Sequence, residues 1–246
     1  MNPDIIVRES SSEVSRWAAE LFAELAQGAV AAHGRFTVAL SGGSTPKATY
    51  TLLAAEPFRS RIPWEKTHIF WGDERCVPPD HEDSNYRMAN EALLSKVNIP
   101  SANIHRMRGE DKDVDPAARA YEQTIREVFG LKAGELPRFD FVMLGMGDDG
   151  HTLSLFPGTT ALSETDRLVV SNWVEKFNTF RITTTAPVVN NAASVAFLAP
   201  GKSKAARLKE VIEGPRDTNR LPSQLIQPTG GELRWIIDRE AAALLK

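Results

Sequence analysis

The chain has 246 residues, of which 42% are hydrophobic and 25% are charged, with a formal net charge of -3 at pH 7. This composition is typical of a soluble globular protein that can bury a large core, and we expect one domain over residues 1–246. The net charge excludes a general attraction for nucleic acid or anionic membranes. Any anionic ligand must therefore be held by local positive groups.

The N-terminal residues show no basic start followed by an apolar segment, and no apolar run approaches about eighteen residues. We therefore expect a cytoplasmic protein. A single cysteine, Cys76, excludes an internal disulfide and a cysteine-rich metal site. No nucleophile signature surrounds Cys76, so we interpret it as a small, partly buried side chain.

The first elements are predicted to be scaffold. Ile5–Val7 is a short strand, and Ser10 and Glu13 have capping-box spacing ahead of an amphipathic helix that Gly34 ends.

A second strand, Phe36–Leu40, runs directly into a glycine turn, and Pro46 suits the first position of the helix that follows. Free amides and hydroxyls at such a turn suit a phosphate, although a well-capped strand-to-helix turn has the same pattern. The Walker A and nucleophile-elbow patterns do not fit. The turn consists of Ser41, Gly42, Gly43, Ser44 and Thr45, with Ser44 or Thr45 as the expected helix cap.

Charged residues follow the third strand, Thr67–Trp71. Arg75 offers a planar fork suited to a phosphate, and Asp73 or Glu74 suits orienting that fork or binding sugar hydroxyls. A surface cluster of salt bridges is the alternative interpretation.

The middle of the chain is predicted to be structural. We expect a helix over Ser84–Lys96, a strand near Ile104–Met107 and a helix from Asp115 to Gly130. His81 and His105 have no partners at metal-ligand spacing, so we predict no role for them in the site.

The stretch Phe139–Thr159, FDFVMLGMGDDGHTLSLFPGT, combines a buried strand with a glycine turn that carries Asp148, Asp149 and His151. Ligands of open α/β sheets sit outside the carboxyl ends of the strands. We therefore predict that His151 is a general base. The turn also matches GxGxxG, but two aspartates would face the diphosphate of a dinucleotide, which disfavours that interpretation.

Further strands and helices alternate to the end of the chain, which predicts an α/β protein with an open, mainly parallel sheet. Lys202 or Lys204 stands at the start of one helix, where a cation is unfavourable unless an anion binds beside it. The predicted strands are Arg167–Val170, Arg181–Thr185, Ser194–Ala199 and Leu233–Ile237, and the predicted helices are Pro187–Asn191, Ala205–Ile212 and Arg239–Leu245.

These stretches together resemble the 6-phosphogluconolactonase family. The resemblance covers LSGGSTPKATYTLL (Leu40–Leu53), FWGDERCVPPDHEDSNYRMANEALL (Phe70–Leu94), LGMGDDGHTLSLFPGT (Leu144–Thr159), RITTTAPVVNNA (Arg181–Ala192) and PGKSKAARL (Pro200–Leu208). It implies a Rossmann-like fold with helices on both faces of the sheet. It also implies hydrolysis of 6-phospho-D-glucono-1,5-lactone to 6-phospho-D-gluconate in the oxidative pentose phosphate pathway, by a monomer or weak homo-oligomer without metal or cofactor.

In this interpretation His151 activates water, Asp149 orients the imidazole, and Arg75 and Lys204 hold the phosphate with the Ser41–Thr45 turn. Lys204 aligns better than Lys202 with the family's lysine, and Arg181 is a weaker candidate for the same anionic region. Glucosamine-6-phosphate deaminase is the nearest competitor. Its members typically carry a glutamate before the proline, whereas Phe156 precedes Pro157 here.

Overall fold

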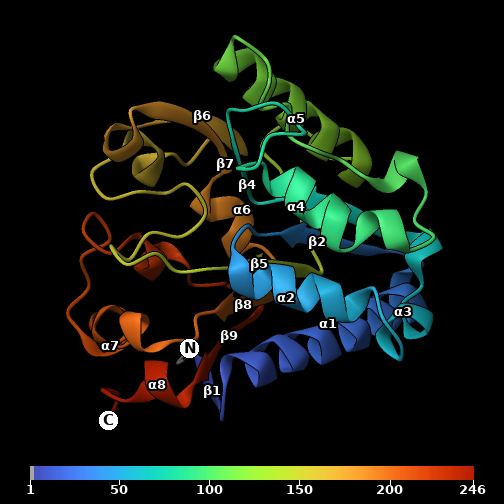
Figure 1. The fold of residues 1–246 in the computed structure, drawn as a ribbon. Coiled ribbons are helices and arrows are strands. Elements are labelled where there is room, and N and C mark those ends of the chain that lie inside the picture. Colours follow the sequence, from blue (N-terminus) through green and yellow to red (C-terminus); the bar gives the residue numbers. More distant parts are fainter. Residues whose placement is uncertain (1–2) are drawn as a thin grey trace.

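A six-stranded parallel sheet forms the centre of the computed structural model, which describes residues 3–246 (Figure 1). Every neighbouring pair of strands is parallel, so the predicted open, mainly parallel sheet is confirmed. The strands run in the order β1 (Asp4–Arg8), β9 (Glu232–Asp238), β8 (Ser194–Leu198), β5 (Phe141–Leu144), β2 (Phe36–Leu40) and β3 (Thr67–Trp71).

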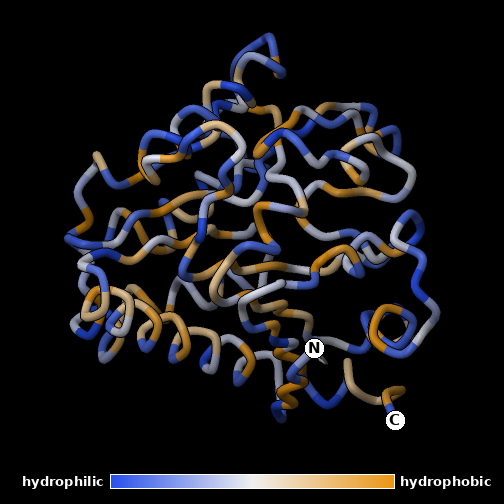
Figure 2. Tube along the Cα trace, turned by 180° about the vertical axis from the view of Figure 1, so that it is seen from behind, coloured by the Kyte–Doolittle hydropathy of each residue, from blue (hydrophilic) through white to orange (hydrophobic). Residues whose placement is uncertain are grey.

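Alternate side chains of the sheet enter two separate cores, one on each face. In β5, Phe141 and Met143 belong to one core, whereas Val142 and Leu144 belong to the other. Both faces are therefore apolar, which explains why the central strands are continuous hydrophobic runs. The tube in Figure 2 shows hydrophobic colour along these strands and alternating colour along the helices that cover them.

Helices cover both faces, as predicted. On one face lie α1 (Ser11–His33), α2 (Ser44–Leu53), α3 (Phe58–Arg61) and α4 (Asn85–Ala92). On the other lie α5 (Val114–Phe129), α6 (Ala186–Asn190), α7 (Ala205–Glu213) and α8 (Arg239–Ala242). No helix within residues 3–246 is long and apolar enough to cross a membrane.

A second, antiparallel sheet stands beyond the carboxyl edge of the first one. It has the order β4 (Asp73–Arg75), β7 (Thr179–Thr184) and β6 (Val169–Val174). Only Gly72 separates β3 from β4, and its carbonyl oxygen accepts a 2.8 Å hydrogen bond from the amide of Thr184. The chain therefore crosses from one sheet to the other within one residue, and this places charged side chains at the junction.

Several predicted bounds differ from the structure, among them the following three. α2 begins at Ser44, because Gly43 adopts φ +108° and caps the helix while Pro46 still lies in its first turn. α4 ends at Ala92 and is followed by a 3₁₀ turn. The predicted strand at Ile104–Met107 forms only one bridge, between Ile104 and Ile69.

Beyond this bridge the chain turns away from β3. A Cβ on Gly109 would lie 2.2 Å from the carbonyl oxygen of Arg75, so the backbone at Gly109 packs against that of β4.

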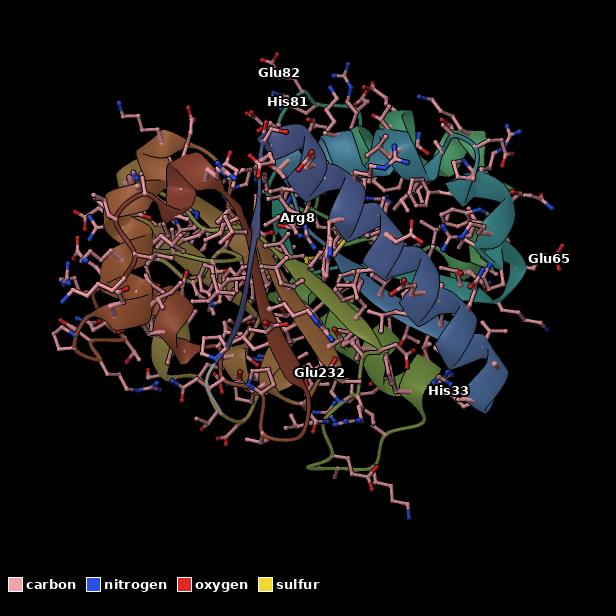
Figure 3. All side chains as sticks on the ribbon, turned by 90° about the horizontal axis from the view of Figure 1, so that it is seen from below. Arg8, His33, Glu65, His81, Glu82 and Glu232 are labelled. Atoms are coloured by element: carbon pink, nitrogen blue, oxygen red, sulfur yellow. The ribbon has the colours of Figure 1, made fainter. Side chains whose placement is uncertain are left out.

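Short 3₁₀ turns complete the chain: η1 (Trp64–Lys66), η2 (Leu94–Lys96), η3 (Ser101–Asn103), η4 (Thr160–Ser163), η5 (Glu175–Phe177), η6 (Lys202–Lys204) and η7 (Pro222–Leu225). Figure 3 labels one residue at each end of the parallel strands. Arg8 lies at the carboxyl end of β1, and Glu232 lies at the amino end of β9.

Candidate active site

Four neighbouring strands, β8, β5, β2 and β3, are followed at the carboxyl edge of the parallel sheet by predicted site residues, whereas Arg181 comes from β7 of the second sheet. The segment after β5 contacts the turn after β3. Ser154 Oγ donates to Asp73 Oδ2 over 2.7 Å, and a Cβ on Gly72 would lie 2.5 Å from Leu153 Cδ2. The segments that follow β3 and β5 are therefore packed together.

His151 and Asp149 form a hydrogen-bonded pair in the turn after β5. Nδ1 of His151 lies 2.5 Å from Oδ1 of Asp149, and both side chains are about one-quarter exposed, at 24% and 25%. An ionised carboxylate only accepts hydrogen bonds, so the neutral imidazole carries its proton on Nδ1. Its Nε2 is then an acceptor, and no hydrogen bond within residues 3–246 involves that atom.

Gly147 is required by this arrangement. A Cβ at Gly147 would lie 2.1 Å from both Cε1 and Nδ1 of His151, so the backbone passes directly against the imidazole. The other face of the ring stacks on Phe156, with centroids 4.0 Å apart. The imidazole is therefore held by a carboxylate at its edge and by packing against its faces.

Asp149 remains ionised because of its hydrogen bonds. Burial alone would raise its pKa, but bonds from His151 and from Lys176 Nζ, 2.8 Å from Oδ2, outweigh that effect and hold the pKa well below its usual range. A negative charge therefore faces the imidazole at Oδ1, where it would stabilise a positive charge on the ring.

The glycine turn after β2 presents free amides. Tyr50 Oη accepts from the amide of Ser41 and donates to its carbonyl oxygen, which leaves the Ser41 backbone satisfied. In contrast, the amides of Gly42 and Gly43 make no hydrogen bond with the rest of the described chain. α2 follows without a side-chain cap, so its first-turn amides also point outward. Such a helix start favours an anion.

Arg75 and Arg181 lie side by side, because they are register partners in the β4–β7 pair. Neither forms a salt bridge within residues 3–246, although Arg75 Nη1 donates to the carbonyl oxygen of Asp83 over 2.7 Å. Burial, together with the neighbouring Arg75, lowers the pKa of Arg181. Two adjacent guanidinium groups without a carboxylate partner form a place that an anion would stabilise.

The two acids of the β4 strand do not orient Arg75 through salt bridges. Asp73 is buried and accepts from Ser154 Oγ and from Asn85 Nδ2. Glu74 is also buried and accepts from the amides of Arg75, Asn85 and Tyr86, so it caps α4. A substrate-binding role for Asp73 stays a prediction.

Lys202 and Lys204 have different surroundings in the structure. Lys204 Nζ donates to Asp148 Oδ1 over 2.5 Å, which ties η6 to the His151 turn, whereas Lys202 is exposed. Asp148 itself is 75% exposed. Because Asp148 is exposed, Lys204 can leave this carboxylate and bind a ligand anion at little cost in free energy.

Among residues 3–246, the three residues that we predicted to be uninvolved form no hydrogen bond with His151, Asp149 or the cations described above. His81 projects from the molecular edge in Figure 3, and its ring lies 3.7 Å from Asp83. His105 stacks on Phe70, and burial lowers its pKa to about 4. Burial raises the pKa of Cys76 to about 11, which makes it a poor nucleophile.

Sequence analysis missed the residues that support the site. Asn85 and Ser154 hold Asp73, Phe156 supports His151, and Lys176 binds Asp149. Each of these contacts joins segments that are remote in sequence or depends on side-chain direction. A single sequence carries no periodic signal for them.

Together the fold and the site define a class of α/β proteins in which a histidine–carboxylate pair and unpaired cations share the carboxyl edge of an open parallel sheet. The chain belongs to the family described as glucosamine-6-phosphate isomerases/6-phosphogluconolactonase, whose model matches residues 9–235.

The chain is similar to known proteins over most of its length. The chain is 47% identical to a protein named 6-phosphogluconolactonase from Synechocystis sp., over 89% of this chain and 88% of the relative. It is 36% identical to a probable 6-phosphogluconolactonase 1 from Arabidopsis thaliana, over 98% and 93% of the two chains. The solved structure of 6-phosphogluconolactonase from Trypanosoma cruzi is 33% identical, with a TM-score of 0.87 over 100% and 98% of the two chains.

Proposed function

We propose that this protein hydrolyses 6-phospho-D-glucono-1,5-lactone to 6-phospho-D-gluconate, a step of the oxidative pentose phosphate pathway. One observation carries the proposal. His151, held by Asp149 with Nε2 left as an acceptor, shares one sheet edge with two arginines that have no carboxylate partner in residues 3–246. A base and an anion site at one edge suit a phosphorylated ester, and the names of the relatives support the same substrate.

The phosphate would be held by groups from separate elements. Arg75 and Arg181 offer adjacent guanidinium forks, Lys204 offers a third cation, and the amides of Gly42 and Gly43 offer uncharged donors. Ser44 and Thr45 extend the amide cradle into α2. Binding energy from this remote group would hold the lactone carbonyl against the base.

The reaction then needs one base and one proton. Nε2 of His151 removes a proton from water as the water oxygen bonds to C1 of the lactone, and a tetrahedral oxyanion forms. As the C1–O5 bond breaks, the imidazolium returns the proton to O5, which becomes the C5 hydroxyl of the open acid. Asp149 holds the imidazole and stabilises its charged form, as carboxylates do in other histidine-dependent hydrolases.

The alternative within the family is deamination or isomerisation of an amino sugar phosphate. Phe156 argues against it, because an apolar ring stacks on His151 at the position where the deaminase pattern places a carboxylate. Similarity to a monomeric glucosamine-6-phosphate deaminase, at 21% identity, supports only the shared fold.

A comparison of two substrates tests the proposal. The purified protein is expected to consume 6-phosphogluconolactone faster than its spontaneous hydrolysis and to release no ammonia from glucosamine 6-phosphate. Ammonia release without lactone turnover would overturn the assignment.

A further inference from the structure

The tip of the β6–β7 hairpin reaches the catalytic pair. Lys176, in η5, donates from Nζ to Oδ2 of Asp149 over 2.8 Å, while Oδ1 of the same carboxylate bonds His151 Nδ1. The two oxygens of Asp149 are thus held by different partners. The hairpin lies beside the yellow segment that follows β5 (Figure 1), although Lys176 is 27 residues from Asp149 along the chain.

A second contact comes from the next residue. The ring of Phe177 packs edge-on against Phe156, with centroids 5.7 Å apart, and Phe156 is the ring on which His151 stacks. The guanidinium carbon of Arg181 lies 5.5 Å from the Phe177 centroid. The hairpin tip therefore touches the carboxylate that orients the base, the ring that supports it, and a cation of the anion site.

We propose that Lys176 is a positioning residue for the lactonase reaction: it fixes Asp149 in the orientation that holds His151. The inference rests on the proposed function of the site. A carboxylate in a glycine-flanked turn can rotate about χ2, and a second hydrogen bond from another element restricts that rotation.

Several charged groups surround the His151 turn. They are Asp148 and Asp149 on the turn itself, Lys176 and Arg181 on the hairpin, Lys204 on η6, and Arg207 on α7. Among these, Lys176 alone shares a carboxylate with the imidazole in the described chain. Removing its ammonium group therefore takes away the hydrogen bond that holds Oδ2 of Asp149.

Substitution of Lys176 leaves the cores intact. Its side chain is 56% exposed and lies at the wall of a cavity of about 720 Å³, which Phe156 and Trp173 also line. A shorter or uncharged side chain there creates no buried void.

The test compares Lys176→Met, Lys176→Arg and a matched control, Lys66→Met, which removes an exposed lysine at the opposite edge of the sheet. Lys176→Met is expected to lower kcat by about 10- to 100-fold, the scale of a misplaced catalytic group, with little change in KM or Tm. Lys176→Arg should restore most of kcat, and Lys66→Met should behave as wild type.

Three outcomes would overturn the inference. They are an unchanged kcat in Lys176→Met, a rise in KM at constant kcat, which would make Lys176 a substrate ligand, and equal losses in Lys176→Met and Lys176→Arg.

If wild type itself fails to hydrolyse the lactone, the proposed function fails, and NMR spectra of the His151 ring, which report the hydrogen bond between Nδ1 and Asp149, still test Lys176. The ring signals are expected to shift in Lys176→Met but not in Lys66→Met, and unchanged signals in Lys176→Met would contradict the positioning role.

Discussion

His151 is oriented by neighbours of different kinds. Asp149 binds its Nδ1, Phe156 covers one face, and the bare backbone of Gly147 lies against the ring. The carboxylate selects the tautomer, whereas the packing fixes the plane of the ring. A general base needs both, because proton transfer requires a lone pair that is free and correctly aimed.

Gly147→Ala tests the packing contribution. The added methyl group would lie 2.1 Å from two ring atoms, so the imidazole must move, and we expect a loss of kcat of about 10²-fold with the fold retained. Gly28→Ala, in α1, is the matched control, since nothing lies within 4 Å of its new Cβ. The prediction is checked by measuring the kinetics and the thermal melting of both variants. Normal turnover in Gly147→Ala would show that the ring position does not limit the reaction.

At this scale the sequence predicts only what is local. Asp149 and His151 are two residues apart in a glycine turn, so their pairing follows from spacing. Lys176 and Asn85 reach the site through contacts between segments that are distant in sequence, and only the folded structure shows such contacts. The sequence also predicts a free amide at Ser41 for a phosphate. In the structure this amide donates to Tyr50 Oη, so it is not free.

At the scale of elements, Glu74 joins the β4 strand to the start of α4. This buried acid accepts from the amides of Arg75, Asn85 and Tyr86 and from Ser84 Oγ. Burial raises the pKa of Glu74, and the amide bonds counter part of that rise. The cap places Asn85 against Gly42, where any Cβ would lie 2.0 Å from the Asn85 amide oxygen.

Loss of this cap should destabilise both the helix and the turns. Glu74→Ala leaves one buried and two partly buried amides without their acceptor, so we expect the free energy of unfolding to fall by about 2–4 kcal/mol. Chemical denaturation measures the change, with the exposed Glu82→Ala as the control. A loss no larger than that of the control would contradict the capping role.

Most elements could be predicted from the sequence, because hydrophobic period and end signals coincide. Phe36–Leu40 and Thr67–Trp71 match β2 and β3, and Ser10 and Gly34 bound α1 as expected. The segment at Ile104–Met107 pairs with β3 only through the Ile104–Ile69 bridge, and Met107 packs into the core instead of continuing the strand. The antiparallel β4–β7–β6 sheet was not anticipated, since strand pairing across the chain has no local signature.

Across the whole molecule, the cations of the proposed anion site come from separate elements. Arg75 lies in β4, Arg181 in β7 and Lys204 in η6. None belongs to the turn that carries His151. Phosphate binding and chemistry are therefore separable, and a variant should be able to lose one without the other.

Arg75→Ala tests this separation. The loss of charge-assisted hydrogen bonds, worth about 1.5–3 kcal/mol, should lower kcat/KM for the phosphorylated lactone by roughly 10- to 100-fold. Slow hydrolysis of unphosphorylated gluconolactone should change little, and Arg119→Ala on α5 serves as the control. Equal losses on both substrates would indicate that Arg75 acts only in the structure.

The central claim is that the imidazole at the carboxyl end of β5 is the base that activates water, and one comparison tests it most directly. The rate of 6-phosphogluconolactone loss above the spontaneous rate is measured for wild type and for His151→Ala. We expect kcat to fall by about 10²–10⁴-fold in the variant, with an unchanged melting curve. Near-normal turnover by a folded His151→Ala protein would contradict the account.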